Sequence, residues 1–514
     1  MDNSFVHIVE ALGFFADPLA IAMLMLGGFV GTLFSAIPGL TGTLGLAILL
    51  PFTYSLPREA AFIMIVGMLG GTLYGGCLTA ISINIPGAPG SVCTTFDGHP
   101  MFKKGKGAEA IGWATFASFV GGTISALLLF LAAPQLAKFA IQFGAPEFAS
   151  LCIFGMIAVI TLADDLIKSL LAACFGLLLS TVGADLFGLI RFTHGNNLLL
   201  GGVPIVPVVV GTFALSMVLV EINDFRHKGE HSELFLEAAR KYKRMKFPPW
   251  SEIKPRIPLI LRCSFLGTFI GFLPGAGGNI AAFVSYNIEN KISKHPEQFG
   301  TGCIDGIAAP ETANNATVGG ILIPTLVLGI PGDQFTAVML GAFLIHGLPV
   351  GPLLFRENPT FIYVVFWTAI FTNFTMVFYG YFGAKFFVKV AALRKSLLLP
   401  LIAIVAITGC YAASRSVSSI GMGVIFAAVG FLFTRYKYPF APLILGLTLG
   451  SIIEESMMQT LMMSSNGMMI FLTRPASLLF VVLSVLFVVT TFVSFKDILN
   501  WIFKKKLPET EQDI

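Results

Sequence analysis

The sequence is poor in charged residues and lacks the motifs of several large enzyme classes. Only 12% of its 514 residues are Asp, Glu, Lys or Arg, about half the share found in an ordinary soluble domain. It contains no G-x-x-x-x-G-K-[ST] phosphate loop, no H-E-x-x-H metal motif and no G-x-S-x-G nucleophile elbow. ATP hydrolysis by this chain is therefore excluded, and we predict that it is not an enzyme.

Other absences narrow the function further. The seven cysteines form no C-x-x-C pair and are predicted to be small buried side chains: Cys77, Cys93, Cys152, Cys174, Cys263, Cys303 and Cys410. The first residues, Met1–Ser4, lack the basic start of a cleavable signal peptide, so we expect the first apolar segment to stay. A net charge of only +4, with basic residues in short loops, argues against nucleic acid as a partner.

What the chain has in abundance is apolar sequence, which makes up 55% of its residues. A membrane-crossing helix needs about 20 apolar residues, and runs of that length recur, as at Ile111–Ala133 and Ala476–Val493. The runs show no alternation of period two, which excludes an outer-membrane barrel. We predict an all-α, polytopic transmembrane bundle with about twelve crossings, surrounded by membrane lipid.

One long polar stretch, residues 223–256, divides the chain nearly in half. Basic residues are enriched in short cytoplasmic loops, so this linker is predicted to lie in the cytoplasm. The loop at Lys103, Lys104 and Lys106 and the tail at Lys504–Lys506 are assigned to the same side. The predicted units are a first transmembrane repeat (1–222), the basic linker (223–256), a second repeat (257–472), and a last helix with its tail (473–514).

The two halves share glycine and proline positions in the same order. Three sets correspond: Gly31–Gly39 with Gly267–Gly275, Ile85–Gly87 with Ile330–Gly332, and Pro207 and Gly211 with Pro442 and Gly446. A duplication explains this register better than chance. If each copy contains an odd number of crossings, the second inserts upside down, which predicts an inverted-topology repeat.

Four Pro/Gly-rich segments interrupt the apolar runs at matching places in the two halves. We call them the first break (37–43), second break (82–91), third break (273–279) and fourth break (328–334). A Pro-Gly pair ends a helix, and broken or re-entrant helices at membrane depth occur only where they are buried or line a cavity. The free N–H groups at the start of a half-helix suit a carboxylate. Ordinary surface loops are the alternative interpretation.

From these breaks we predict a substrate site for a small carboxylate. Its candidate residues are Pro38, Gly39, Thr41, Gly42, Thr43, Asn84, Pro86, Gly87, Ser91, Pro274, Gly275, Gly277, Gly278, Asn279, Pro331 and Gly332. A polar run that leads into an apolar stretch supplies oxygen ligands of the kind that Na⁺ prefers. Its candidate cation ligands are Glu311, Thr312, Asn314, Asn315 and, from the fourth break, Asp333. The alternative role for Glu311 and Asn314 is to cap a helix start.

Weaker candidates have simpler explanations. Gly67, Gly71 and Gly75 are predicted to pack helices closely. The pair Asp164–Asp165 with Lys168 is interpreted as a loop with a local ion pair, and Glu454–Glu455 as an interfacial pair or a proton site. The lone histidines His99 and His346 are left unassigned.

Several of these motifs resemble the large membrane subunit of the tripartite tricarboxylate transporters, the TctA family. The resemblance extends from about Gly31 to Leu472. It rests on Pro274–Gly278, Ala309–Ala316, Ile330–Gly332, Asn84–Pro89 and Phe96–Gly98.

The resemblance implies a carrier in the bacterial inner membrane that imports citrate or a related carboxylate, driven by a Na⁺ or H⁺ gradient. It also implies two partners, a small four-helix membrane subunit and a periplasmic substrate-binding protein, and no cofactor. The family's glycine-rich run falls on Pro274–Gly278, and its Pro-Glu-x-x-x-Asn run falls on Pro310, Glu311, Asn314 and Asn315. The first break matches the third less well, because Leu40 and Thr41 replace Ala276 and Gly277.

Three alternatives stay open at this point. A stand-alone carrier would need no partners, and a passive channel would need no gradient. A membrane-embedded enzyme acting on lipid-linked substrates would need clustered acidic residues or a histidine pair, and only Asp164–Asp165 approaches that.

Overall fold

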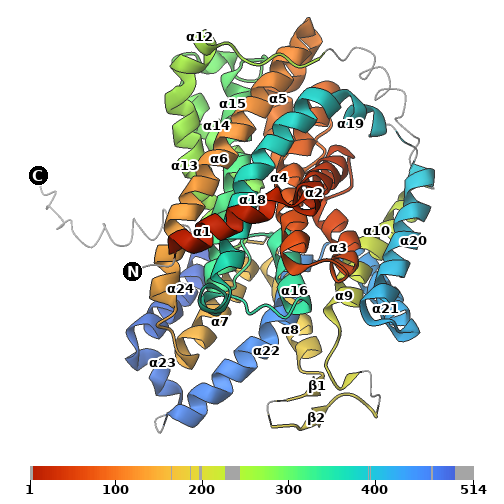
Figure 1. Ribbon diagram of the computed structural model, residues 1–514, viewed down its shortest axis with the longest axis vertical. Coiled ribbons are helices and arrows are strands. Elements are labelled where there is room, and N and C mark those ends of the chain that lie inside the picture. Colours follow the sequence, from red (N-terminus) through yellow and green to blue (C-terminus); the bar gives the residue numbers. More distant parts are fainter. Residues whose placement is uncertain are drawn as a thin grey trace, which may run out of the picture.

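The computed structural model describes residues 4–163, 165–185, 187–195, 199–225, 244–391, 393, 395–464 and 467–492, and nearly all of its elements are helices (Figure 1). The first half contains α1 (Ser4–Gly13), α2 (Pro18–Ala36), α3 (Gly42–Thr53), α4 (Arg58–Ile83), α5 (Val92–Met101), α6 (Gly107–Ala140), α7 (Ala145–Thr161), α8 (Leu166–Ser180), α9 (Ile205–Val209), η5 (Val210–Leu215) and α10 (Ser216–Phe225). Short turns η1 (Phe14–Ala16), η2 (Pro89–Ser91) and η3 (Phe102–Lys106) connect some of them.

The second half is also built from long and short helices. It contains α12 (Trp250–Ile253), α13 (Ile257–Phe272), α14 (Gly277–Ile292), α15 (Asp305–Leu328), α16 (Gln334–Ile345), α17 (Pro352–Glu357), α18 (Pro359–Phe378), η8 (Tyr379–Gly383), α19 (Ala384–Val390), α20 (Lys395–Ser414), α21 (Val417–Tyr436), α22 (Phe440–Met463), α23 (Ile470–Thr473) and α24 (Pro475–Phe492). The predicted linker residues 226–243, the tail residues 493–514 and Asp164 lie outside the described residues.

Seven helices in the described part of the chain are long and apolar enough to cross a membrane, or eight if a bent pair forms one span. The bent pair, Gly467–Thr473 and Pro475–Val489, turns by 91°. Six further apolar helices have only 10 to 17 residues: Phe5–Ala16, Gly42–Thr53, Ala145–Thr161, Leu166–Ser180, Gln334–Ile345 and Leu398–Ala413. The chain is thus an all-α, multi-pass membrane protein, and the count of about twelve crossings stays a prediction.

Each of the four breaks interrupts a helix at the predicted place. Gly39 has φ 89° after α2, and Gly275 and Gly277 have φ 83° and 61° between α13 and α14. At the ends of α4 and α15, Asn84 and Gly329 adopt φ 60° and 72°. Left-handed backbone of this kind stops a helix and is easiest for glycine or asparagine.

Close helix packing depends on glycine, as predicted for Gly67, Gly71 and Gly75. A Cβ atom added to Gly71 would lie 2.4 Å from the Gly28 carbonyl oxygen, and one on Gly75 would lie 2.3 Å from that of Thr32. On Gly67 the added atom would lie 2.9 Å from the Leu24 carbonyl oxygen. These contacts join α2 to α4, and α13 packs on α15 in the same way.

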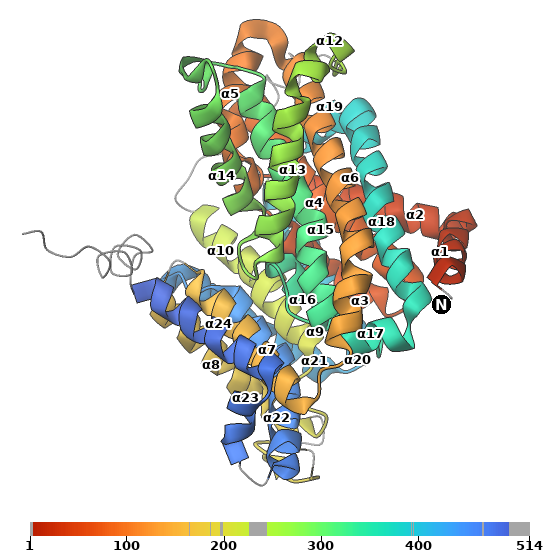
Figure 2. The same ribbon diagram turned by 90° about the vertical axis from the view of Figure 1, so that its left-hand side faces the viewer.

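Helices of one half also pack on helices of the other. α6 contacts α15, where a Cβ atom on Gly121 would lie 2.2 Å from the Thr312 carbonyl oxygen. α18 contacts α4, where the Thr372 hydroxyl donates to the Gly67 carbonyl oxygen over 3.0 Å. Figure 2 shows α6, α13 and α15 running side by side. α7 and α8 pack on α22, and α20 and α21 pack on η5.

The only β-strands among the described residues form a short antiparallel ribbon, which the sequence analysis did not predict. β1 (Gly183–Ala184) pairs with β2 (Ile190–Arg191) beyond the end of α8. The two terminal guanidinium nitrogens of Arg191 donate to Glu454 of α22, over 2.6 and 2.9 Å. Glu454 therefore anchors the ribbon, which gives a structural role to one member of the predicted acidic pair.

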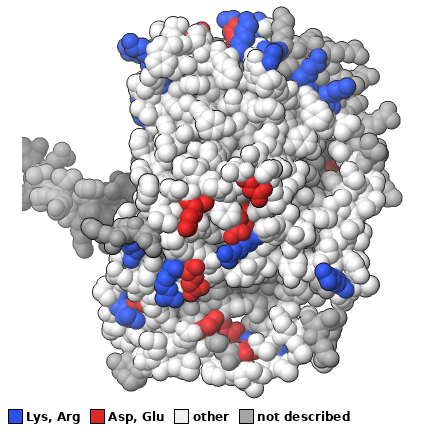
Figure 3. All heavy atoms as spheres, in the orientation of Figure 1, with Lys and Arg blue, Asp and Glu red and all other residues white. Residues whose placement is uncertain are grey.

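The molecular surface is suited to contact with membrane lipid. On the face shown in Figure 3, Lys and Arg gather along the upper edge, and an uncharged band separates them from a mixed group of acidic and basic side chains in the lower half. Large apolar side chains are exposed along α20, α21 and α24, as at Leu401, Ile425 and Val485. Exposed apolar helix faces are favourable where lipid replaces water.

Candidate functional site

All four breaks meet at one cavity of about 780 Å³, which we call the main cavity. Each break contributes part of its lining: Thr41, Gly42 and Thr43 from the first, Ala88, Pro89 and Gly90 from the second, Gly275–Asn279 from the third, and Pro331, Asp333 and Gln334 from the fourth. Asn314, in the middle of α15, lines it too. This volume is in the range of small-molecule sites. The structure therefore brings segments from both halves of the sequence to one place.

Backbone contacts hold the breaks in position. The Gly275 N–H donates to the Gly332 carbonyl oxygen over 2.8 Å, which joins the third break to the fourth. The second break lies against α2 and α4, since a Cβ atom on Gly87 would lie 2.0 Å from the Ser35 carbonyl oxygen. The Gly87 N–H also reaches the Gly76 carbonyl oxygen at 3.4 Å. Some glycines of the breaks are thus needed for turn geometry and close packing.

Several helices begin at the main cavity, and their first turns carry N–H groups without partners in the helix. Asp333 caps α16, since its Oδ1 accepts from the Thr336 N–H and hydroxyl, each over 2.8 Å. Thr41 caps α3 through the Leu44 N–H at 3.1 Å. The starts of α14 and η2 have no side-chain cap. The third break therefore offers the dipole of α14 to an anion, whereas α16 already has a carboxylate at its start.

Asn314 lies between the two halves at the main cavity. Its Nδ2 donates to the Leu73 carbonyl oxygen of α4 over 2.8 Å. Its Oδ1 is buried and has no hydrogen-bond partner among the described residues. Cβ atoms added to Gly90 and Gly278 would lie 2.4 and 2.2 Å from this oxygen. This oxygen is therefore covered by the second and third breaks and keeps an unused hydrogen-bonding capacity where they meet.

A second polar cluster, the Glu311 cluster, is buried beside the cavity and consists of Glu311, Thr94, Ser118 and Asn315. The Ser118 hydroxyl donates to Glu311 over 3.0 Å and accepts from Asn315 Nδ2 at 2.8 Å, and the Thr94 hydroxyl also donates to Glu311. Glu311 is fully buried and forms no ion pair with a described residue. Asn315 Oδ1 and the hydroxyl of neighbouring Thr312 have no partner in the described structure.

The predicted cation ligands are therefore divided into two groups. Asn314 and Asp333 line the main cavity, whereas Glu311, Thr312 and Asn315 do not. The predicted substrate residues that lie in the breaks but outside the cavity lining are Pro38, Gly39, Asn84, Pro86, Gly87, Ser91, Pro274 and Gly332. These residues lie in the turns that interrupt the helices.

The sequence analysis missed two walls of the main cavity. One is the junction of α7 and α8, with Val159, Leu162, Ala163, Asp165 and Lys168; the other is the junction of α21 and α22, residues 437–442, with Leu445. Asp165 and Lys168 do form the predicted local ion pair, at 3.3 Å. Their place on the cavity was not predicted. The sequence feature that could have indicated these walls was the match of Pro207 with Pro442, a residue of the second junction. Leu69, Thr72 and Leu73 of α4 were missed as well.

A smaller cavity of about 290 Å³ lies at other helix ends. Its lining comes from the end of α3, the start of α9, the end of α16 and the end of α20: Pro51, Tyr54, Gly201, Val203–Pro207, Leu344, Ile345 and Ala413. In the predicted repeat, Pro207 of this lining is the counterpart of Pro442, which lines the main cavity.

The described residues contain no group of three His, Cys, Asp or Glu side chains that could hold a metal ion. Five cysteines are buried as predicted, whereas Cys174 is exposed and Cys303 is half-buried. Of the unassigned histidines, His99 contacts the Ile81 carbonyl oxygen at 3.1 Å and His346 contacts the Thr53 hydroxyl at 3.3 Å. Both roles are structural.

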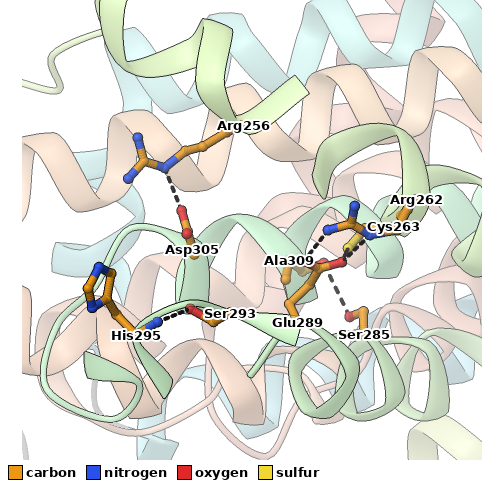
Figure 4. Close-up of polar contacts among 9 residues, drawn as sticks. All are labelled: Arg256, Arg262, Cys263, Ser285, Glu289, Ser293, His295, Asp305 and Ala309. Atoms are coloured by element: carbon orange, nitrogen blue, oxygen red, sulfur yellow. Dashed lines mark hydrogen bonds and ion pairs between the residues drawn. The ribbon is translucent and has the colours of Figure 1, made fainter. Parts of the chain in front are cut away.

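Charged contacts away from the cavity fix the helices that carry it. Figure 4 shows the Arg262 guanidinium of α13 reaching Glu289 of α14, with distances of 2.9 and 2.6 Å, and Arg256 beside Asp305 at the start of α15. The Ser285 hydroxyl donates to the Ala309 carbonyl oxygen over 3.2 Å and joins α14 to α15. These bonds join α14, which begins at the third break, to α13 and to α15, which carries Asn314.

Asp97 of α5 fixes the loop between α14 and α15. Its carboxylate is fully buried and accepts from the Tyr286 hydroxyl at 2.9 Å and from the N–H groups of Gly300, Gly302 and Cys303 at 3.0, 2.8 and 2.8 Å. Burial, followed by the charge of Asp97, raises the pKa of the Cys303 thiol in this loop to about 12.

A multi-pass helical bundle whose broken helices surround a cavity belongs to the class of membrane transport proteins. The chain belongs to the tripartite tricarboxylate transporter TctA family, which matches residues 21–445 and confirms the predicted resemblance. It is therefore a membrane subunit of that type of transporter, one component of a three-part system and not an enzyme.

Two relatives from Agrobacterium vitis are uncharacterized. The chain is 35% identical over 469 residues to the uncharacterized 52.8 kDa protein in the TAR-I ttuC′ 3′ region, covering 90% of this chain and 91% of the relative. It is 34% identical over 215 residues to the uncharacterized protein in the TAR-II ttuC′ 3′ region, covering 41% of this chain and 89% of that relative. No solved structure matches the chain.

Proposed function

We propose that this chain is the transport subunit of a cation-coupled uptake system for citrate or a related carboxylate in the bacterial inner membrane. A periplasmic binding protein would deliver the substrate, and a small four-helix subunit would complete the complex. The observation that carries the proposal is the meeting of all four breaks at one cavity of about 780 Å³. Paired helix breaks at a shared site are typical of secondary transporters.

A carboxylate of the substrate would bind at the start of α14. The first turn there has no side-chain cap, and Gly277 and Gly278 of this turn line the cavity. Thr43 and Asn279 add polar side chains to the same lining. Backbone N–H groups and a helix dipole favour an anion without requiring a paired cation.

The coupling cation, Na⁺ or H⁺, would bind in the Glu311 cluster. An ionised carboxylate buried without a positively charged partner is costly, and a bound cation or a proton removes that cost. The Ser118 and Thr94 hydroxyls and the unpaired Asn315 Oδ1 supply further oxygens. Asn314, three residues along the same helix, is the link between this cluster and the main cavity.

Alternating access would follow from an inverted repeat. The packing of α7 and α8 on α22 corresponds to that of α20 and α21 on η5, and the packing of α6 on α15 corresponds to that of α18 on α4. In the predicted repeat, the small cavity at Gly201–Pro207 and Ala413 would be the counterpart of the junctions of the main cavity. If the two halves exchanged these packing arrangements, the site would open to the opposite side of the membrane.

The test is uptake of labelled citrate by cells that contain this chain, the small subunit and the binding protein, with and without a Na⁺ gradient. Uptake should require all three proteins and the gradient. Uptake by this chain alone would support a stand-alone carrier, and flux without a gradient would support a passive channel. No uptake of any carboxylate under any of these conditions would refute the proposed function.

Two substitutions test the site within this assay. Asn314→Ala and Asp333→Ala should each reduce uptake at least tenfold, since both side chains line the main cavity. Gln459→Ala is the matched control, because its side chain is exposed on α22, where it contacts Glu455. Unchanged uptake by both site variants would refute the site assignment and leave the transporter function standing.

A further inference from the structure

Four charged side chains line the main cavity: Asp165, Lys168, Asp333 and Lys437. The two carboxylates already have structural roles. Asp333 caps α16, and Asp165 caps α8 by accepting from the Lys168 N–H over 3.1 Å. The two ammonium groups are the positive charges among the lining residues.

The two lysines come from the same region of the cavity wall. Lys168 Nζ lies 6.0 Å from the ring centroid of Tyr438, the residue next to Lys437. The Lys168 side chain is 34% exposed, and its ion pair with Asp165 is 3.3 Å long, so an incoming anion can reach the ammonium group. Lys437 is exposed and forms no ion pair with any described residue.

The backbone at Lys437 supports a role for its side chain. Lys437 ends α21 with φ 58°, and the next N–H, that of Tyr438, donates to the Phe433 carbonyl oxygen over 2.8 Å. This is a helix-ending turn in which glycine is the usual residue, because a Cβ atom is unfavourable in left-handed backbone. Lys437 therefore adopts an unfavourable backbone conformation at a position that lines the cavity.

We propose that Lys168 and Lys437 determine specificity by binding a second carboxylate of the substrate. The proposal rests on the function proposed above. One carboxylate would bind the N–H groups of α14 at the third break, and another would bind the two ammonium groups at the junctions. A substrate with two or three carboxylates satisfies both places at once, whereas a monocarboxylate fills one of them. The site would therefore select di- and tricarboxylates over monocarboxylates.

Binding would change the partner of Lys168 without leaving Asp165 unsatisfied. The substrate carboxylate would compete with Asp165 for the ammonium group. Asp165 would keep its bond from the Lys168 N–H and its position at the start of α8, where a negative charge is favourable. The exchange therefore leaves no charge without a partner.

The experiment measures KM and kcat for labelled citrate in the three-protein uptake assay, with unlabelled succinate and acetate as competitors. The variants are Lys168→Met, Lys437→Met, the double variant, and the conservative Lys168→Arg and Lys437→Arg. Lys138→Met is the control, because Lys138 is exposed near the end of α6 and does not line the cavity. Melting temperatures of the purified variants in detergent identify any that fail to fold.

Each methionine variant should raise the KM for citrate roughly tenfold to a hundredfold, with a smaller effect on kcat, because a charge-assisted bond is lost. The arginine variants should retain most of the affinity, and acetate should compete weakly in every case. A folded double variant with an unchanged KM, or a wild-type chain that binds acetate as well as citrate, would overturn the inference. A wild-type chain without any carboxylate uptake would overturn the proposed function itself.

Discussion

Replacing Asp97 with alanine should destabilise the protein by disconnecting α5 from the loop between α14 and α15. The Asp97 carboxylate is fully buried and accepts four hydrogen bonds, from the Tyr286 hydroxyl and three N–H groups. Its Oδ2 also lies close to the start of α15, where a Cβ atom added to Gly306 would be 2.0 Å away. The substitution removes all of these contacts together.

The size of the effect follows from the exposure of the four donors. Gly300 is exposed, so water replaces its lost partner, whereas Tyr286 is 8% exposed and Gly302 and Cys303 are half-buried. A hydrogen bond to a charged group contributes about 1.5 to 3 kcal/mol, and bonds that share one acceptor are not additive. We therefore expect Asp97→Ala to lower the unfolding free energy by about 3 to 5 kcal/mol.

The assay is denaturant unfolding of the purified chain in detergent, followed by tryptophan fluorescence. Asp97→Asn should cost about half as much as Asp97→Ala, because an amide keeps one acceptor oxygen. Asp305→Ala is the control. Its ion pair with Arg256 is partly exposed, at 35% for Asp305, and should contribute no more than about 1 kcal/mol. An Asp97→Ala variant as stable as the Asp305→Ala variant would refute this reasoning.

Three further predictions concern the site and its surroundings. Gly278→Ala should reduce citrate uptake at least tenfold, because the added Cβ atom would lie 2.2 Å from Asn314 Oδ1. Gly421→Ala is its control and should have no effect, because no atom lies within 4 Å of a Cβ atom added there. Glu311→Gln should make residual uptake independent of the cation gradient, which a measurement with and without Na⁺ would show; uptake that still rises with the gradient would contradict it. A double-mutant cycle on Arg191 and Glu454, both 29% exposed, should give a coupling energy of about 0.5 to 1 kcal/mol in unfolding experiments, and a value near zero would show that the ribbon is not held by this pair.

The breaks were predictable because their signal is local. Proline and glycine interrupt an apolar run in any tertiary context, so Pro38–Gly39 and Pro274–Gly275 indicated where helices end before any packing was known. The close packing at Gly71 and Gly75 was also predictable, since small residues four apart form one face of a helix. In both cases a few neighbouring residues determine the structure.

The walls around Lys168 and Lys437 were not predictable in this way. Their place at the cavity depends on how α7, α8, α21 and α22 pack against the breaks, and apart from the match of Pro442 with Pro207 no residue at the two junctions indicates that packing. A local ion pair such as Asp165–Lys168 has the same sequence pattern on a loop and on a binding site. The number of membrane crossings could not be counted from the sequence for a related reason. An apolar helix of 12 residues such as α16 is shorter than the roughly 20 residues of a full span, so its length does not decide whether it crosses the membrane.

The division of the predicted cation ligands has a consequence for coupling. Glu311 and Asn315 are one turn apart on α15, and Asn315 Nδ2 contacts the Glu311 carbonyl oxygen at 3.2 Å. Asn314 projects from the same turn to the main cavity, where its amide bonds to Leu73 of the other half. A cation bound at Glu311 would therefore act on a helical turn that already touches the substrate site. Because α15 packs tightly on α6 and α13, the turn is expected to move with its neighbours and not alone. Cation binding and substrate binding would then stabilise the same arrangement of the two halves, which is the thermodynamic condition for coupled transport.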